Sequence, residues 1–344
     1  MTSSHLDLMT LKEDELKALW PFWYPVLPFE RLGPEPFALE LLGQQLVLWL
    51  QPDGSVAVAE DRCCHRSARL SGGWIKEQGE LVCPYHGWEF GVNGHCLLVP
   101  QEPGRVIPAN YKIKTHLTQV RYSYVWVCLS DEPLTPIPDF PEADDPCTRQ
   151  IKGFFETWIC SPFRVIENGL DNYHHYFVHR GLLDATTPIP EPLQDQIRET
   201  NDGFSFSIPL EVSNNATLSE TINSQDNRVI VQRQVCWITP LGLSLKLEWP
   251  NGMSQRIVLY AFPLDCKNTR IVRFYFRNDT DEMVPEVEII KFERGLINQD
   301  RQILEGIDKD YGATPSHECL IEADRPIAMM RLRLLHLLGK TLAG

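Results

Sequence analysis

The chain has 344 residues, of which 43% are hydrophobic and 23% are charged, and its formal net charge is −14. These fractions are ordinary for globular proteins and exclude a disordered, collagen-like or disulfide-stapled chain, while the length suits two domains. The acidic balance disfavours nucleic-acid binding, because negative charge repels phosphate backbones. No apolar run reaches the roughly 18 residues of a membrane span, and no apolar signal core stands near the N-terminus. We therefore expect a cytoplasmic protein that binds neither nucleic acid nor membrane.

The first third of the sequence predicts short antiparallel strands joined by turns. Gln51-Pro52-Asp53-Gly54 is a turn signal, since proline presets φ and glycine permits a positive φ, and Asn93-Gly94 is a hairpin signal. Both signals lie between runs of β-branched and aromatic residues, which favour strands. We expect an antiparallel β domain over about residues 20–130. Its clearest strands are expected at residues 46–50, 56–60, 90–92, 95–99 and 121–129.

The remainder predicts a linker and a second, mixed domain. Five prolines between Ser130 and Pro146 block helices and central strands, which suits a stiff linker. Strands in series with helices at the ends favour an α+β fold over alternating βαβ units. Helices are predicted at 165–179, 287–308 and 329–342, and strands at 203–212, 228–237, 241–249, 255–262 and 271–277.

The strongest chemical signal is Cys63-x-His65, followed after 17 residues by Cys83-x-x-His86. Thiolates and neutral imidazoles bind metals, and two hairpin tips can bring them together. Zinc fingers pair like ligands, whereas each arm here holds one cysteine and one histidine. This suits a two-iron, two-sulfide cluster in which one iron takes both thiolates and the other both imidazoles, which makes a one-electron relay. A zinc site of mixed ligands is the alternative.

The same segment resembles the Rieske iron–sulfur family, because Leu70-Ser71-x-Gly73 and Pro84-Tyr85-His86-Gly87-Trp88 also match. Ala68 and Tyr85 stand where respiratory-chain members have an extra cysteine pair, which favours the oxygenase and ferredoxin branch. Cys64 departs from the family, which usually has proline or another small residue there. We expect Cys64 to be a packed, inert thiol, and the alternative is an oxidisable thiol beside the cluster.

A second constellation, Asp171-x2-His174-x4-His179, lies in a predicted helical stretch. Two histidines and one carboxylate form the facial triad of non-haem iron(II) oxygenases. On an ideal helix, His174 and His179 point about 140° apart. We therefore predict that the helix is distorted or ends between them. Buried core histidines are the alternative interpretation, and His175 is a rival ligand by adjacency.

The third ligand of such a triad is expected on the predicted helix 287–308. On a helical wheel Asp300 lies inside the apolar stripe, whereas Glu305 lies outside it and Asp308 lies on its edge. A buried carboxylate needs a partner, because an unpaired one is costly or takes up a proton. We predict that Asp300 binds iron, and the alternative is a buried salt bridge to an arginine. The stripe consists of Ile289, Phe292, Leu296, Ile303, Leu304 and Ile307.

Together the motifs resemble the Rieske non-haem iron oxygenases over nearly the whole chain. The monooxygenase-type members are most similar, such as vanillate and dicamba O-demethylases, caffeine N-demethylases and saxitoxin-tailoring hydroxylases. The resemblance implies a Rieske domain over residues 1–145, with an N-terminal extension and the linker, and a helix-grip type catalytic domain over 146–344. It implies a homotrimer in which Asp171 links His86 of one subunit to His174 of the next. We expect Asn168 either to brace Asp171 or to orient the site. The implied cofactors are a Rieske [2Fe-2S] cluster on Cys63, His65, Cys83 and His86 and a mononuclear iron(II) on His174, His179 and Asp300.

The resemblance also implies an activity, namely hydroxylation of a C–H bond in a small organic substrate, such as a secondary metabolite or alkaloid. Oxidative N- or O-demethylation is the alternative, and cis-dihydroxylation of an aromatic ring is a lesser one. The chain has no flavin or nicotinamide fingerprint, so NAD(P)H must act through a separate ferredoxin or reductase. We expect the pocket to be lined by residues 200–280, where large side chains serve equally well as core. These are Phe204, Phe206, Trp237 and Tyr260.

Overall fold

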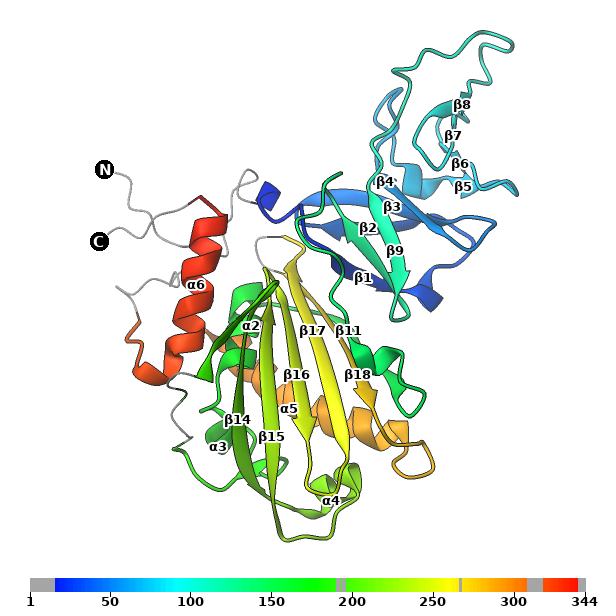
Figure 1. Ribbon diagram of the computed structural model, residues 1–344. Coiled ribbons are helices and arrows are strands. Elements are labelled where there is room, and N and C mark those ends of the chain that lie inside the picture. The colour runs from blue at the N-terminus through cyan, green and yellow to red at the C-terminus, as the bar shows by residue number, and fades with distance from the viewer. Residues whose placement is uncertain (1–15, 190–192, 194–195, 266–267, 308–317, 340–344) are drawn as a thin grey trace, which may run out of the picture. The chain divides into compact units, whose positions relative to one another are not determined.

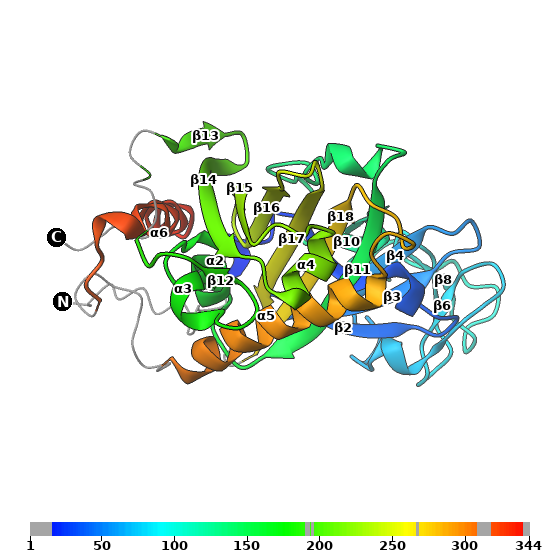
Figure 2. The ribbon, with the colours of Figure 1, turned by 90° about the horizontal axis from the view of Figure 1, so that it is seen from below.

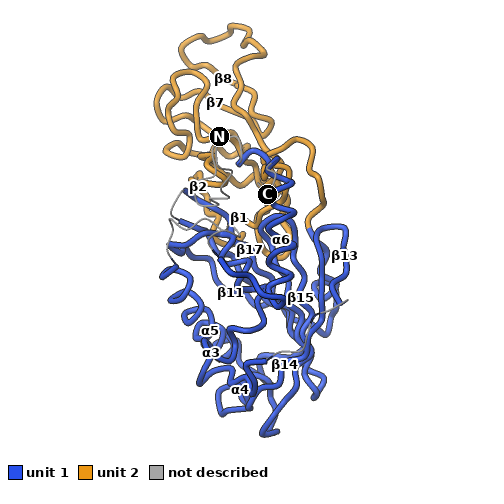
Figure 3. Tube along the Cα trace, turned by 90° about the vertical axis from the view of Figure 1, so that its left-hand side faces the viewer, with its two compact units in different colours: residues 1–18, 138–344 blue, residues 19–137 orange. Residues whose placement is uncertain are grey.

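The computed structural model describes residues 16–189, 193, 196–265, 268–307 and 318–339 (Figure 1). The chain divides into two compact units, Leu19–Ile137 and Pro138–Gly344, the second of which also includes Met1–Ala18 (Figure 3). The division falls inside the proline-rich segment, and the predicted boundary between residues 145 and 146 stays a prediction. No helix among the described residues is both long enough and apolar enough to cross a membrane.

The N-terminal unit is built from small antiparallel sheets, as expected. A three-stranded sheet has the order β1–β10–β9, a second has the order β2–β3–β4, and a four-stranded sheet runs β5–β6–β7–β8. Their bounds are β1 Tyr24–Pro28, β2 Phe37–Leu41, β3 Gln44–Leu50, β4 Val56–Glu60, β5 Trp74–Ile75, β6 Leu81–Val82, β7 Glu89–Phe90, β8 Cys96–Leu98, β9 Leu117–Arg121 and β10 Tyr124–Cys128. The two turn signals fall between β3 and β4 and between β7 and β8.

A compact core holds these short strands in place. Trp49 is fully buried, and its indole N–H donates a hydrogen bond to the carbonyl oxygen of Gly79 at 3.0 Å. Gly73 sits so close to β6 that a Cβ atom there would lie 1.8 Å from the carbonyl oxygen of Val82. A side chain at this position is therefore excluded by the backbone of the neighbouring strand.

The C-terminal unit contains one large antiparallel sheet, again as expected. Its strand order is β11–β18–β17–β16–β15–β14–β12. Strand β13 lies outside this order and pairs with the first residues of β14. The bounds are β11 Arg149–Trp158, β12 Asp184–Ala185, β13 Arg198–Thr200, β14 Gly203–Ser213, β15 Arg228–Ile238, β16 Gly242–Glu248, β17 Ser254–Pro263 and β18 Thr269–Arg277. Strand β11 was not anticipated from the sequence, because its register shifts between Lys152 and Phe154 and interrupts the alternation of buried residues.

Helices cover one face of this sheet, and α5 runs across it (Figure 2). The helix bounds are α2 Pro162–Leu170, α3 His175–Val178, α4 Ala216–Ile222, α5 Glu286–Gly306 and α6 Arg325–Leu337. The expected stretch 165–179 is two helices that are separated at residues 171–174, ahead of His174. The predicted helix end between His174 and His179 is found at Val178, where α3 stops. The last predicted helix, 329–342, begins and ends earlier than expected, and its residues 340–342 lie outside the described part of the chain. Helix α4 was missed because it is only seven residues long.

The buried face of α5 is turned relative to the predicted stripe. Ile303 was placed in the stripe but is 54% exposed, whereas Glu293 is buried. The buried positions are Ile289, Phe292, Glu293, Ile297 and Leu304. A wheel built from apolar residues alone misplaces the face, because polar side chains with buried partners also belong to it.

Candidate functional site

Two loops of the N-terminal unit present Cys63, His65, Cys83 and His86, and both loops have the same backbone hydrogen bonds. In the first loop, the N–H of Ser67 donates to the carbonyl of Cys63 at 2.9 Å, and the N–H of Cys63 donates to Ala68 at 2.8 Å. The second loop repeats this pattern: Gly87 donates to Cys83 at 3.0 Å, and Cys83 donates to Trp88 at 2.8 Å. The repeated geometry gives each loop one inward cysteine.

The four side chains divide by depth, with the two thiols inside and the two imidazoles nearer the surface. Cys63 and Cys83 are buried, whereas His65 is exposed and His86 is partly exposed. The imidazole rings of the two histidines have centroids 4.6 Å apart, and His65 stacks on Trp88 with an interplanar angle of 2°. Burial raises the pKa of the Cys63 thiol, and the neighbouring Cys83 raises it further. Iron bound by these thiols would reverse this preference, because a metal binds the thiolate form.

The first loop is braced from beneath by a buried carboxylate. Asp61 accepts hydrogen bonds from the backbone N–H and the hydroxyl of Ser71, at 2.7 and 2.6 Å. Cys64 differs from expectation: it is exposed rather than packed, so that prediction is wrong. The fold turns Cys63 inward, and the next side chain on the tight loop then faces outward. Desolvation nonetheless raises the pKa of Cys64, which disfavours the reactive thiolate.

In the C-terminal unit, α2 ends at Asp171, and this ending places the second set of residues. Asp171 has an extended backbone, with φ −78° and ψ 134°, and its carboxylate accepts the backbone N–H of Tyr173 at 2.7 Å. The chain then turns into the short helix α3, which carries His174 at its N-terminus and His179 at its C-terminus. Because α3 ends at Val178, His179 has a non-helical backbone, with φ −92° and ψ 29°, and the two imidazole centroids lie 5.2 Å apart.

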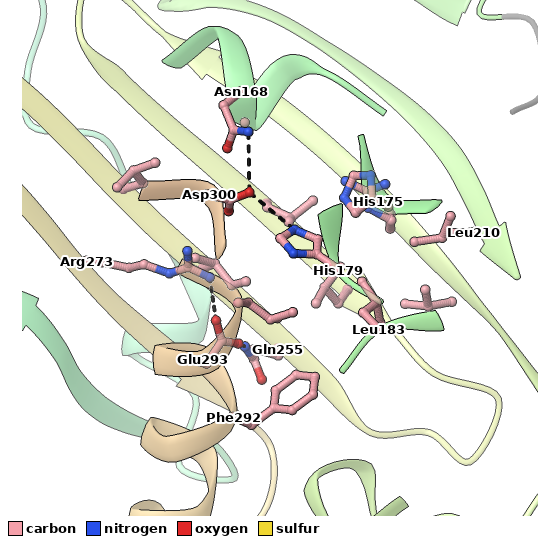
Figure 4. Close-up of a pocket in the computed structure, with 18 of the residues that line it drawn as sticks. Asn168, His175, His179, Leu183, Leu210, Gln255, Arg273, Phe292, Glu293 and Asp300 are labelled. Carbon is pink, nitrogen blue, oxygen red and sulfur yellow. Dashed lines mark hydrogen bonds and ion pairs between the residues drawn. The ribbon is translucent and has the colours of Figure 1, made fainter. Parts of the chain in front are cut away.

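The short helix α3 brings His174 and His179 together with Asp300 of α5. Each of these residues offers one ligand atom, and the three atoms lie within 4.8 Å of one another. Oδ1 of Asp300 lies 3.4 Å from Nε2 of His179 and 3.8 Å from Nε2 of His174. Asn168 donates to the same Oδ1 atom at 3.4 Å (Figure 4). A carboxylate between two imidazoles, braced by an amide, is a donor set that suits iron(II).

Acceptors on the other ring nitrogens support this interpretation. Nδ1 of His174 lies 3.1 Å from Oδ2 of Asp171, and Nδ1 of His179 lies 3.1 Å from Oε1 of Gln299. Each acceptor fixes the proton on Nδ1 and leaves the lone pair of Nε2 directed at Asp300, as metal-binding histidines require. Gln299 was not identified from the sequence, since a glutamine beside an aspartate on a helix carries no signal of its own.

The electrostatics of these groups also suit a metal site. Burial lowers the pKa of His179, against the attraction of Asp300, so the imidazole is neutral as a ligand must be. Burial alone raises the pKa of Asp171, but the hydrogen bond and charge of His174 outweigh it and lower the pKa.

The rival residues occupy other positions. His175 is buried, its Nδ1 lies 3.3 Å from the carbonyl oxygen of Asn172, and it is not part of the three-residue group. Glu305 accepts hydrogen bonds from the backbone N–H of Ile159 at 2.8 Å and from Arg301 at 2.9 Å, which is a structural use. Asp308 lies outside the described residues.

A cavity of about 130 Å³ opens beside the three residues. It lies between the sheet and helices α2, α3 and α5, and most of its walls are apolar (Figure 4). Phe204, Phe206, Trp237 and Tyr260 are buried but do not line it, so they belong to the core. The apolar wall consists of Leu183, Leu210, Ile222, Val231, Leu243, Leu245, Leu247, Trp249, Ile257, Leu259, Phe292 and Leu296.

Polar residues at the cavity were mostly missed from the sequence. Glu293 accepts a hydrogen bond from Gln255 at 2.7 Å and forms an ion pair with Arg273. Arg233 reaches the same cavity from β15. The available signal was the period-two pattern of β15, in which Arg233 takes a buried position between exposed neighbours.

Comparison with known proteins agrees with this geometry. The Rieske [2Fe-2S] domain matches residues 22–116, and the vanillate O-demethylase oxygenase C-terminal domain matches residues 158–339. Methylxanthine N1-demethylase NdmA of Pseudomonas putida is 38% identical over 324 residues, which cover 91% of this chain and 87% of that protein. The dicamba O-demethylase oxygenase component of Stenotrophomonas maltophilia is 35% identical over 161 residues, 46% of this chain and 47% of that protein.

Solved structures give the same result. The NdmA QL mutant of Pseudomonas putida CBB5 with theobromine aligns with a TM-score of 0.79 and 27% identity, covering 95% of this chain and 92% of that one. Family match, fold and cofactor-type residues therefore agree over both units. The chain belongs to the Rieske non-haem iron oxygenases, which are oxidoreductases that combine a [2Fe-2S] cluster with a mononuclear iron.

Proposed function

We propose that this chain is the oxygenase component of an oxidative demethylase, which removes an N- or O-methyl group from a small organic substrate. The observation that carries the proposal is the group His174, His179 and Asp300 at the wall of a small apolar cavity. Relatives named as methylxanthine N1-demethylase, dicamba O-demethylase and vanillate O-demethylase support methyl removal over the other two activities considered from the sequence.

We assign the cluster to Cys63, His65, Cys83 and His86 and the mononuclear iron to His174, His179 and Asp300. When bound, this iron supplies activation of dioxygen with electrons received through the cluster. The protein supplies the rest: Asp171 and Gln299 orient the two imidazoles, and Asn168 orients Asp300. The apolar wall excludes bulk water and positions the methyl group.

The overall reaction balances as follows. A methyl group, dioxygen, two electrons and two protons give a hydroxymethyl group and one water molecule. The hydroxymethyl group then collapses, so that its C–N or C–O bond breaks and formaldehyde leaves with the demethylated product. The two electrons come from NAD(P)H through a separate ferredoxin or reductase, which suits a cytoplasmic location.

Asp171 is proposed as the link between the two centres in a homotrimer. Its Oδ2 contacts His174, yet 25% of its side chain stays exposed. The exposed part leaves room for a second imidazole, and His86 of a neighbouring subunit is the proposed partner. A homotrimer places one such contact at each interface between subunits.

The test is product analysis under labelled dioxygen. The holoenzyme is incubated with NADH, a ferredoxin–reductase pair and a set of N-methyl and O-methyl aromatic compounds. We expect one formaldehyde molecule for each demethylated product, as measured by mass spectrometry. A product that gains two oxygen atoms and keeps its methyl group would contradict demethylation, and so would inactivity of the iron-loaded enzyme towards every methylated compound tested.

A further inference from the structure

Three arginines of the large sheet point to its helix-covered side, and two of them have carboxylate partners. Arg277 is 1% exposed and donates to Asp279 at 2.5 Å, to Gln255 at 2.6 Å and to the carbonyl oxygen of Thr221 at 2.8 Å. Arg273 forms an ion pair with Glu293. These two arginines show how the fold neutralises a buried cation when the cation has a structural role.

Arg233 is the exception. It is 4% exposed, and its Nη1 atom has no hydrogen-bond partner in the described part of the chain. Across the sheet it pairs with Ile208 on one side and Leu247 on the other, so its lateral neighbours are apolar. None of the ion pairs among the described residues includes Arg233. Asp171 attracts the Arg233 guanidinium without forming an ion pair with it. A buried guanidinium with no ion-paired carboxylate destabilises the unliganded fold, and a role in ligand binding explains its presence.

The charges around the cavity point to an anion. The lining contains Arg233 and Arg273 against Asp171, Glu293 and Asp300, which leaves one net negative charge. An iron(II) ion at the proposed site turns this into one net positive charge. Burial lowers the pKa of Arg233 to about 10, against the attraction of Asp171, so its guanidinium remains charged at neutral pH.

We propose that Arg233 binds the carboxylate of a small, mainly apolar substrate, and that the enzyme acts on monoanionic carboxylic acids. This inference rests on the proposed function. A planar guanidinium binds a carboxylate with two parallel hydrogen bonds, and it fixes the orientation of the rest of the substrate. A cavity of about 130 Å³ is close to the roughly 150 Å³ cavity that holds a benzene ring. The substrate is therefore about the size of one ring, with its methyl group directed at the iron.

Binding to the holoenzyme tests this directly. Titration calorimetry without oxygen compares benzoate, 4-methoxybenzoate and cyclohexanecarboxylate with their primary amides, which have the same shape but no charge. We expect at least one acid to bind at least ten times more tightly than its amide. If no acid in the panel binds more tightly than its amide, the inference is overturned.

Variants then assign the preference to one residue. Arg233→Gln is expected to lower the affinity for the preferred acid at least tenfold and to leave that of the amide unchanged. Arg233→Lys should restore part of it, because the charge remains but the paired donors are lost. Arg228→Gln is the matched control, since Arg228 lies exposed on the same strand. An acid affinity in Arg233→Gln equal to that of the wild type would show that the metal alone binds the carboxylate.

A stability measurement separates binding from a structural role. Arg233→Met removes a buried charge without a partner, so the unfolding midpoint of the substrate-free protein should rise. A structural arginine would give a lower midpoint, which would count against the inference. The proposed function fails separately, if acids bind with the expected preference but no formaldehyde is released.

Discussion

In the N-terminal unit, the candidate cluster ligands lie within 24 consecutive residues, Cys63 to His86, whereas in the C-terminal unit 121 positions separate His179 from Asp300. The first site needs two loops with the same hydrogen-bond pattern, each closed by a residue with positive φ, Ser67 or Gly87. The second needs a helix break, a long helix and the sheet between them. A local site is encoded by short motifs, and a long-range site depends on packing.

The two sites also differ in what supports them. The cluster loops rest on backbone hydrogen bonds and on the carboxylate of Asp61. The proposed mononuclear site rests on side chains, since Asp171 and Gln299 contact the two imidazoles. Single substitutions in the C-terminal unit should therefore disable the proposed mononuclear site and leave the cluster site intact.

The largest expected effect is that of His174→Ala. We expect the variant to lose the mononuclear iron, so that about three iron atoms per chain fall to about two. Turnover should fall by more than about 100-fold, because even the partners of metal ligands cost about 10–100-fold when they are removed. The visible absorption of the cluster should remain, because its ligands lie in the other unit. Iron analysis and optical spectra measure both quantities. Turnover at the wild-type rate would contradict the assignment.

Asp279→Ala should destabilise the C-terminal unit, because it removes the partner of a buried charge. The change leaves Arg277 buried without its carboxylate and removes a partner of Arg149. We expect a loss of about 3–5 kcal/mol in the free energy of unfolding of this unit. Chemical denaturation followed by far-ultraviolet circular dichroism measures it. Glu288→Ala is the control, because its ion pair with Lys291 is exposed and contributes less than about 1 kcal/mol.

Asp171→Asn should uncouple the two sites without emptying either. The amide is nearly isosteric, so both metal contents should stay normal, but it carries no charge to connect two imidazoles. We expect reoxidation of the cluster in a single turnover to slow by about 10²-fold or more, which corresponds to about 2.7 kcal/mol. Stopped-flow absorption measures this rate. Reoxidation at the normal rate would rule out Asp171 as the link.

Cys64→Ala should have the smallest effect. The residue is exposed, and desolvation raises the pKa of its thiol, so neither packing nor reactivity depends on it. We expect the unfolding free energy to change by no more than about 0.5 kcal/mol and the cluster potential to remain unchanged. A shifted potential in redox titration would show that the thiol acts on the cluster.

The sequence by itself determined the fold class, the antiparallel N-terminal strands, and the order of the strands from residue 203 onwards with the long helix that follows them. It also indicated that a helix ends between His174 and His179, because a continuous helix cannot direct both side chains at one ion. These features depend on local periodicity, turn chemistry and short motifs, all of which are visible in one dimension.

Only the tertiary structure decided which face of α5 is buried, that Cys64 is exposed, and that Gln299 contacts His179. It also revealed that Arg273 and Arg277 have carboxylate partners whereas Arg233 has none in the described residues. The reason is physical: whether a buried charge is neutralised depends on groups brought together from distant segments, and no pattern in the sequence specifies those contacts.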